Sequence, residues 1–143
     1  MKMYPTKIMV AVDGSAASDR AITQAVELCD ATRSELHLLL VGLISPWTHP
    51  DTLSERQYGR LKQENQRRLD QEVEKARAGG AKAVVAHLRM GRVDTEVVRL
   101  AEEIGVGLLV VGNRGRESLA RVLLGHDSES IVRHAPCSVM VVR

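Results

Sequence analysis

Three glycines near the carboxyl end have a spacing that suits phosphate binding. Gly112 and Gly115 are separated by two residues, and Gly125 follows after nine more, at the start of an expected helix. A glycine has no Cβ atom, so its backbone can adopt unusual dihedral angles and approach a phosphate closely. The amino end of a helix adds free N–H groups and a positive dipole. The spacing therefore predicts an anion-binding loop, although glycines that only end a strand and begin a helix would give the same pattern.

A second polar segment, Asp13-Gly14-Ser15, follows an apolar run near the amino end. In an open parallel sheet, ligands bind beyond the carboxyl ends of the strands, where the strand order reverses. We expect the strands that end near Asp13 and Val111 to meet there, so that the two polar segments face each other across one crevice. The alternative for Asp13 is a local role, in which its carboxylate only closes the first turn.

The elements that must position these segments follow from hydrophobic periodicity. Apolar runs rich in Val, Ile and Leu alternate with stretches of helical period, which predicts an α/β fold around a parallel sheet. We expect strands at 7–13, 35–41, 82–89, 108–111 and 138–142, and helices at 16–31, 51–78, 94–104 and about 126–134. Ser15 and Asp94 are the expected N-caps. Five such strands predict an open, doubly wound, five-stranded sheet of the Rossmann or flavodoxin type.

Size and charge exclude several classes of protein. A chain of 143 residues that is 44% apolar fits a single domain spanning 1–143. Its 20 basic and 18 acidic residues are interleaved, which argues against a nucleic-acid groove. The charged helix at 51–78 is expected to present a solvated face. No apolar run has the length of a membrane span, and residues 1–6 are too few for a signal peptide, so we expect a cytoplasmic protein without a membrane partner.

Residues for catalysis or metal binding are not grouped in the sequence. The histidines are scattered through strands, a loop and a helix end, and no serine has a base at a telling spacing. Cys29 and Cys137 are far apart and are expected to be reduced, buried thiols. The Walker pattern GxxxxGK[ST] is absent, so P-loop hydrolysis is unsupported. We therefore expect no enzyme and no metal site, with a slow ATPase as the alternative.

The carboxyl-terminal segment resembles the universal stress protein family, whose nucleotide-binding members carry Gly-x2-Gly-x9-Gly followed by Ser or Thr. Residues 107–143 read GLLVVGNRGRESLARVLLGHDSESIVRHAPCSVMVVR, and residues 8–15 read IMVAVDGS. The resemblance covers nearly the whole chain. It implies strand order 3-2-1-4-5, a role in the stress response, a homodimer formed through the last strand, Ser138–Val142, and a protein partner whose identity the sequence does not give.

The same resemblance implies a cofactor, ATP or another adenine nucleotide, with or without Mg²⁺. Asp13 and Val41 would lie on the adenine and ribose side. The phosphate side would be formed by Val111, Gly112, Arg114, Gly115, Gly125, His126 and Ser128. Ala11, Val12 and Asp127 complete the expected set of binding residues.

The two residues after Gly125 depart from the family pattern, because His126-Asp127 stand where a hydroxyl and a small apolar residue are usual. An aspartate about 6 Å from a phosphate, at an effective dielectric of about 20, repels it by roughly 3 kcal/mol. One charge-assisted hydrogen bond returns about 1.5–3 kcal/mol. A protonated His126 would instead favour the phosphate. Two hypotheses follow: a nucleotide-binding dimer, and a dimeric interaction protein in which His126 and Asp127 close the phosphate site and no nucleotide binds.

Overall fold

Helices and strands alternate along the whole described part of the chain. The computed structural model describes residues 2–44, 53–113 and 127–143. The elements in chain order are β1 (Lys7–Val12), α1 (Ala16–Thr32), β2 (Glu35–Leu43), α2 (Glu55–Ala78), β3 (Val84–Gly91), α3 (Val93–Ile104), β4 (Leu108–Gly112), α4 (Asp127–His134) and β5 (Ser138–Val142). The predicted α/β fold is confirmed.

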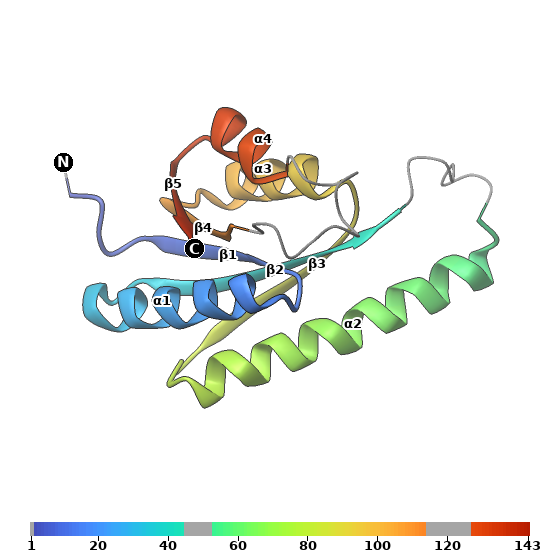
Figure 1. The fold of residues 1–143 in the computed structure, drawn as a ribbon, viewed down its shortest axis with the longest axis horizontal. Helices are drawn as coiled ribbons and strands as arrows, with labels where there is room; N and C mark the ends of the chain where they lie inside the picture. The colour runs from blue at the N-terminus through green and yellow to red at the C-terminus, as the bar shows by residue number, and fades with distance from the viewer. Residues whose placement is uncertain (1, 45–52, 114–126) are drawn as a thin grey trace.

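The strands form one parallel sheet in the order β3-β2-β1-β4-β5, as predicted (Figure 1). β1 is central, since Ile8 pairs with Leu36 on one side and with Leu108 on the other. The chain continues from β1 to β2 on one side of β1, whereas β4 lies on the other side of β1. The strand order therefore reverses between β1 and β4, which is where a ligand binds in open α/β sheets.

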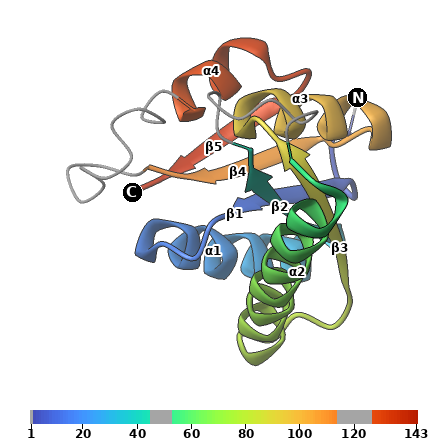
Figure 2. The ribbon, with the colours of Figure 1, turned by 90° about the vertical axis from the view of Figure 1, so that its right-hand side faces the viewer.

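Two helices cover each face of the sheet (Figures 1 and 2). Successive β1 side chains point to opposite faces, because side chains alternate along a strand. Ile8 and Val10 pack in a core with apolar residues of α1 and α2, including Ile22 and Leu69. Met9 packs in a second core with residues of α3 and with Ile131 of α4. This core connects the two helices on that face of the sheet. Within the described ranges, no helix is both long and apolar enough to cross a membrane.

Two predicted helix starts are wrong. The long helix does not begin at residue 51: α2 begins at Glu55, because Ser54 and Gln57 form a capping box. The Ser54 Oγ accepts from the Gln57 N–H at 3.1 Å, and the Ser54 N–H donates to the Gln57 Oε1 at 3.0 Å. Asp94 is not an N-cap, since α3 begins one residue earlier and its N-cap, Arg92, makes no side-chain cap hydrogen bond.

The Asp94 carboxylate binds neighbours in both helices of its face of the sheet. It accepts hydrogen bonds from the Thr95 N–H at 2.9 Å, the Ser130 Oγ at 2.9 Å and the Arg92 Nε at 3.1 Å. Burial of the carboxyl opposes ionisation, but these donors outweigh it and lower the pKa of Asp94. The carboxylate therefore ties the start of α3 to α4.

Strands β2 and β3 run past their predicted ends. Val41 pairs with Arg89, and the pairing continues through Gly42 with Met90 and Leu43 with Gly91. The sequence-based prediction ended these strands at Val41, directly before Gly42, and at Arg89, two residues before Gly91. The longer ladder carries Leu43 to the carboxyl edge of the sheet, where it lines a cavity described below.

Two histidines expected to be scattered lie against each other on β2 and β3. The rings of His37 and His87 are stacked with centroids 5.2 Å apart, and the His37 Nδ1 lies 2.9 Å from the His87 Nε2. Burial is the main cause that lowers both pKa values, and each ring also faces positive charge: His37 faces His87 and Lys7, and His87 faces Arg89. Glu35 opposes the shift at His37 without reversing it.

This pair makes stability depend on pH. Because both pKa values are lowered in the folded protein, its rings take up protons at a lower pH than those of the unfolded chain, whose histidines titrate near the ordinary pKa of about 6.5. The contribution of the pair to the free energy of unfolding is therefore complete above about pH 6.5. It is lost as the pH falls below that value toward the lower pKa values of the folded protein. We expect urea unfolding at pH 7.5 and pH 5.5 to show this loss, and His87→Gln to reduce it. His134→Gln, at an exposed position of α4, is the control; an equal reduction in both variants would contradict the assignment.

Candidate nucleotide-binding site

The β1–α1 loop holds its shape through its own polar groups. The Asp13 Oδ1 accepts from the Ser15 N–H at 2.8 Å, so the carboxylate does close its own turn. Ser15 caps α1 as predicted, accepting from the Ser18 N–H at 3.1 Å, and the Ser18 Oγ accepts from the Asp13 N–H at 3.2 Å. Gly14 completes the turn with a φ of +81°. The loop is thus fixed before any ligand binds.

Gly112, at the end of β4, has a packing role as well as its expected ligand role. A Cβ atom added there would lie 2.7 Å from the Ala17 carbonyl carbon and 2.9 Å from the Ser18 backbone nitrogen. These are backbone atoms of the first turn of α1, which cannot rotate away. The glycine is therefore required for α1 to approach β4, whatever its position relative to a phosphate.

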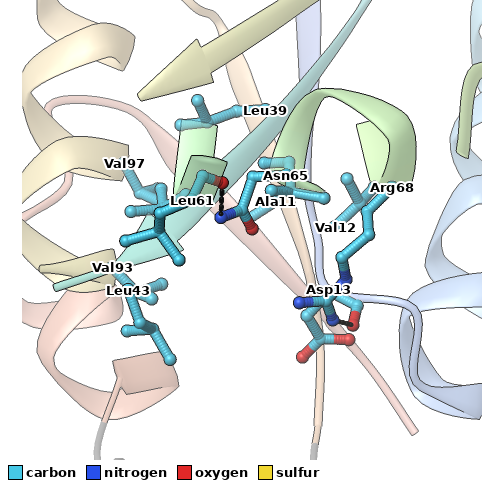
Figure 3. A pocket seen from close by; sticks show the side chains of 12 residues that line it. Ala11, Val12, Asp13, Leu39, Leu43, Leu61, Asn65, Arg68, Val93 and Val97 are labelled. Atoms are coloured by element: carbon cyan, nitrogen blue, oxygen red, sulfur yellow. Dashed lines mark hydrogen bonds between the residues drawn. The ribbon is translucent and has the colours of Figure 1, made fainter. Parts of the chain in front are cut away.

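A cavity of about 270 Å³ opens at the carboxyl edge of the sheet (Figure 3). The walls are mostly apolar, with three polar side chains among them. The lining residues are Ala11, Val12, Asp13, Leu39, Leu40, Val41, Leu43, Leu61, Asn65, Arg68, Val93 and Val97. Four of the predicted site residues, Ala11, Val12, Asp13 and Val41, therefore share one cavity.

A smaller hollow of about 20 Å³ adjoins it on the β4 side and brings together Asp13, Val111, Gly112 and Ser128 with Ser15 and Ser18. Ala11, Asp13 and Val93 line both spaces. Asp13 and Ser15 of the first polar segment and Gly112 of the second therefore line one hollow. Arg114, Gly115, Gly125 and His126 lie outside the described residues, and Asp127 is described only as the first residue of α4.

Three lining residues come from α2, the charged helix that was predicted to present a solvated face. Leu61, Asn65 and Arg68 are spaced four and three residues apart, so they lie on one side of the helix. The Arg68 Nη2 donates to the Asp13 carbonyl oxygen at 3.4 Å and so connects α2 to the β1–α1 loop. Further along, Glu72 is buried and pairs with Lys75 at 3.0 Å. The helical spacing of residues 61, 65 and 68 could have indicated that they face the sheet together. The many charged residues around them on α2 made this pattern difficult to recognise.

Reactive side chains are not grouped in this site. Within residues 2–44, 53–113 and 127–143, no cluster of three or more His, Cys, Asp or Glu side chains is arranged to hold a metal ion. Both cysteines are free and half-buried, and burial raises the pKa of Cys29 to about 11, which keeps that thiol protonated at neutral pH. The chemistry that the described site offers is binding through apolar walls and a few hydrogen-bonding groups.

A five-stranded parallel sheet with a cavity of about 270 Å³ at the point where its strand order reverses defines a Rossmann-like α/β domain. The profile of the Universal stress protein family matches residues 5–143, and the chain belongs to that family. It is 32% identical over 146 residues to the universal stress protein YxiE of Bacillus subtilis, covering 96% of this chain and 98% of the relative.

Two solved structures are similar over nearly the whole fold. The universal stress protein UspA from Lactobacillus plantarum has a TM-score of 0.81 and 27% identity, covering 98% of this chain and 99% of the other. A universal stress protein in complex with cAMP has a TM-score of 0.67 and 25% identity, covering 96% of each chain. Relatives of this chain therefore include one with an adenine nucleotide bound.

Proposed function

We propose that this protein binds an adenine nucleotide, ATP in the first place, and acts in the stress response as a homodimer that changes its partner contacts when the nucleotide is bound. The observation that carries the proposal is the cavity at the strand-order reversal, which is lined by Asp13 and Val41 and continues toward Gly112 and Ser128. The relative in complex with cAMP supports the same ligand class.

The residues present fit such a ligand. The apolar walls formed by Leu39, Val41 and Val93 suit the faces of a base, which gains by leaving water. The cavity of about 270 Å³ is just below the range of about 300–1,000 Å³ typical of small-molecule sites. It therefore suits a base and part of its sugar, with the phosphates directed toward the hollow beside Gly112 and Ser128.

The functional groups of the site favour binding over catalysis. Asp13 is engaged with the Ser15 N–H, and Ser15 caps α1, so neither is held beside a base that would activate it. A nucleotide that binds only the folded protein stabilises it by mass action, about 2.7 kcal/mol at a concentration one hundred times the Kd. Binding would thereby favour the nucleotide-bound form of the protein, and that form is what a partner protein would read.

The dimer is proposed through β5. This strand lies at one end of the sheet order, so one of its edges has no neighbouring strand within the described residues. Val141 of β5 and Val132 of α4 are large apolar side chains that stay 42% and 51% exposed. An apolar edge strand left open invites aggregation, and pairing with a second copy removes that hazard.

Calorimetry on nucleotide-stripped protein tests the proposed ligand. We expect micromolar binding of ATP, compared with ADP, AMP and cAMP, each with and without Mg²⁺. Gly115→Val should weaken ATP binding at least tenfold, because a branched side chain would keep phosphate from the backbone. Gly59→Val on α2, where an added Cβ meets nothing within 4 Å, is the matched control. Absence of binding by every nucleotide would overturn the proposal in favour of a ligand-free interaction protein.

A further inference from the structure

Asn65 is a buried polar side chain in an otherwise apolar stretch of the cavity wall. The residue is 5% exposed and lies on α2 between Leu61 and Arg68. Its Nδ2 donates to the Leu61 carbonyl oxygen at 2.8 Å, one helical turn earlier. The Oδ1 makes no hydrogen bond in the described part of the chain. This oxygen is not itself fully buried; it is an unused acceptor on the cavity wall, and a ligand that covers it must supply a donor or leave it unpaired.

The orientation of this amide is determined by its surroundings. Only a donor can face the Leu61 carbonyl at 2.8 Å, so the NH₂ group must lie there and the oxygen must point the other way. Figure 3 shows the nitrogen on the Leu61 carbonyl and the oxygen turned away from it. The amide nitrogen packs closely over Gly42 of β2, where a Cβ atom would lie 2.8 Å from the Asn65 Nδ2. The side chain thus presents an acceptor to the cavity.

The rest of the cavity offers few competing groups near this oxygen. Leu39, Val41, Val93 and Val97 are apolar, and the Asp13 carboxylate is engaged by the Ser15 N–H. A ligand that fills the cavity and satisfies Asn65 must therefore combine a flat apolar body with an N–H donor at its edge. Adenine has such a donor in its exocyclic amine, whereas hypoxanthine carries a carbonyl oxygen at the same ring position, which would face the amide oxygen without a proton between them.

We infer that Asn65 is a specificity-determining residue of this site, whose amide oxygen accepts a hydrogen bond from the exocyclic amine of the base and selects aminopurines over oxopurines. This inference rests on the proposed function, since it concerns the same cavity. A site built to hydrogen-bond a polar group discriminates strongly against an analogue that lacks it, because its own buried group is then left unpaired.

The experiment compares ATP with inosine triphosphate, which differs in that one ring substituent, by calorimetry on the full chain. The wild-type protein should bind ATP at least about tenfold more tightly. Asn65→Leu, which keeps the branched shape without the acceptor, should weaken ATP binding by a similar factor, leave inosine triphosphate unchanged or stronger, and so remove the preference. Gln66→Leu, on the exposed side of the same helix, should retain it.

The outcomes separate the two proposals. Equal binding of both nucleotides by the wild-type protein overturns the role of Asn65 and leaves nucleotide binding in place. A preference for ATP that persists undiminished in Asn65→Leu also overturns it. Binding of neither nucleotide overturns the proposed function and this inference together. Because the wild-type comparison changes only the ligand, equal binding of the two nucleotides overturns the role of Asn65 even if Asn65→Leu fails to fold.

Discussion

Replacing Gly112 with alanine should lower the free energy of unfolding by about 3 kcal/mol or more. The new methyl group would lie 2.7–2.9 Å from backbone atoms of Ala17 and Ser18, so α1 and β4 would have to move apart. Overpacking a core typically costs about 1–3 kcal/mol, and here the obstacle is backbone that has no alternative rotamer. Urea unfolding followed by circular dichroism measures the change.

Gly59 provides the control for this substitution. It lies inside α2, and an added Cβ meets nothing within 4 Å. Gly59→Ala should therefore stabilise the protein by about 0.5–1 kcal/mol, because alanine loses less backbone entropy in a helix. The two glycine-to-alanine changes are expected to have opposite signs. A loss of less than about 1 kcal/mol in Gly112→Ala would show that α1 adjusts easily and that the close approach is not required.

Truncation of Leu69 to alanine is expected to cost about 2–5 kcal/mol, because it removes a side chain that is 2% exposed and leaves a cavity between α2 and the sheet. α2 is a mostly polar helix, and Leu69 with Val73 and Ala76 supplies most of its buried apolar surface. The loss is large against a total stability of about 5–15 kcal/mol for a typical domain.

Leu43→Ala is the matched control, since Leu43 remains 42% exposed at the end of β2. The free energy of unfolding of Leu43→Ala should fall by less than about 1 kcal/mol, because this side chain removes a smaller area from water. Equal losses in the two leucine variants would mean that α2 does not depend on Leu69 for its attachment. Thermal or urea unfolding under the same conditions gives both values.

The sequence predicted the sheet and its order because periodicity and the family resemblance agree along the whole chain. Buried strands such as Leu108–Gly112 read as short apolar runs, and α1 and α3 carry clear apolar stripes. The predictions failed where one side chain decided an outcome. Ser54 and Gln57 form the capping box that sets the start of α2 at Glu55, four residues after the predicted start. Asp94 bonds Ser130, thirty-six residues away.

The candidate site was predicted on its β1 side and missed on its α2 side. Asp13 follows β1 and Gly112 ends β4, so the topology rule places them together without any side-chain detail. Val41, near the end of β2, was predicted from the family resemblance. Asn65 and Arg68 lie among charges on a helix whose buried face is narrow. Which polar residues of such a helix turn toward the sheet edge depends on the position of the helix against β2 and β3, and that position is a tertiary property.

The pairing of β1 with β4 has a consequence for synthesis of the chain. Ile8 and Leu108 are 100 residues apart in the sequence, yet they are neighbours in the sheet, and Ser128 lines the hollow at the carboxyl ends of the same two strands. While the ribosome has released only β1 to β3, the edge of β1 that pairs with β4 is open, and the hollow lacks Val111, Gly112 and Ser128. The site of the proposed nucleotide is therefore complete only after α4 has been made, and a strand edge left unpaired before then is a hazard for aggregation.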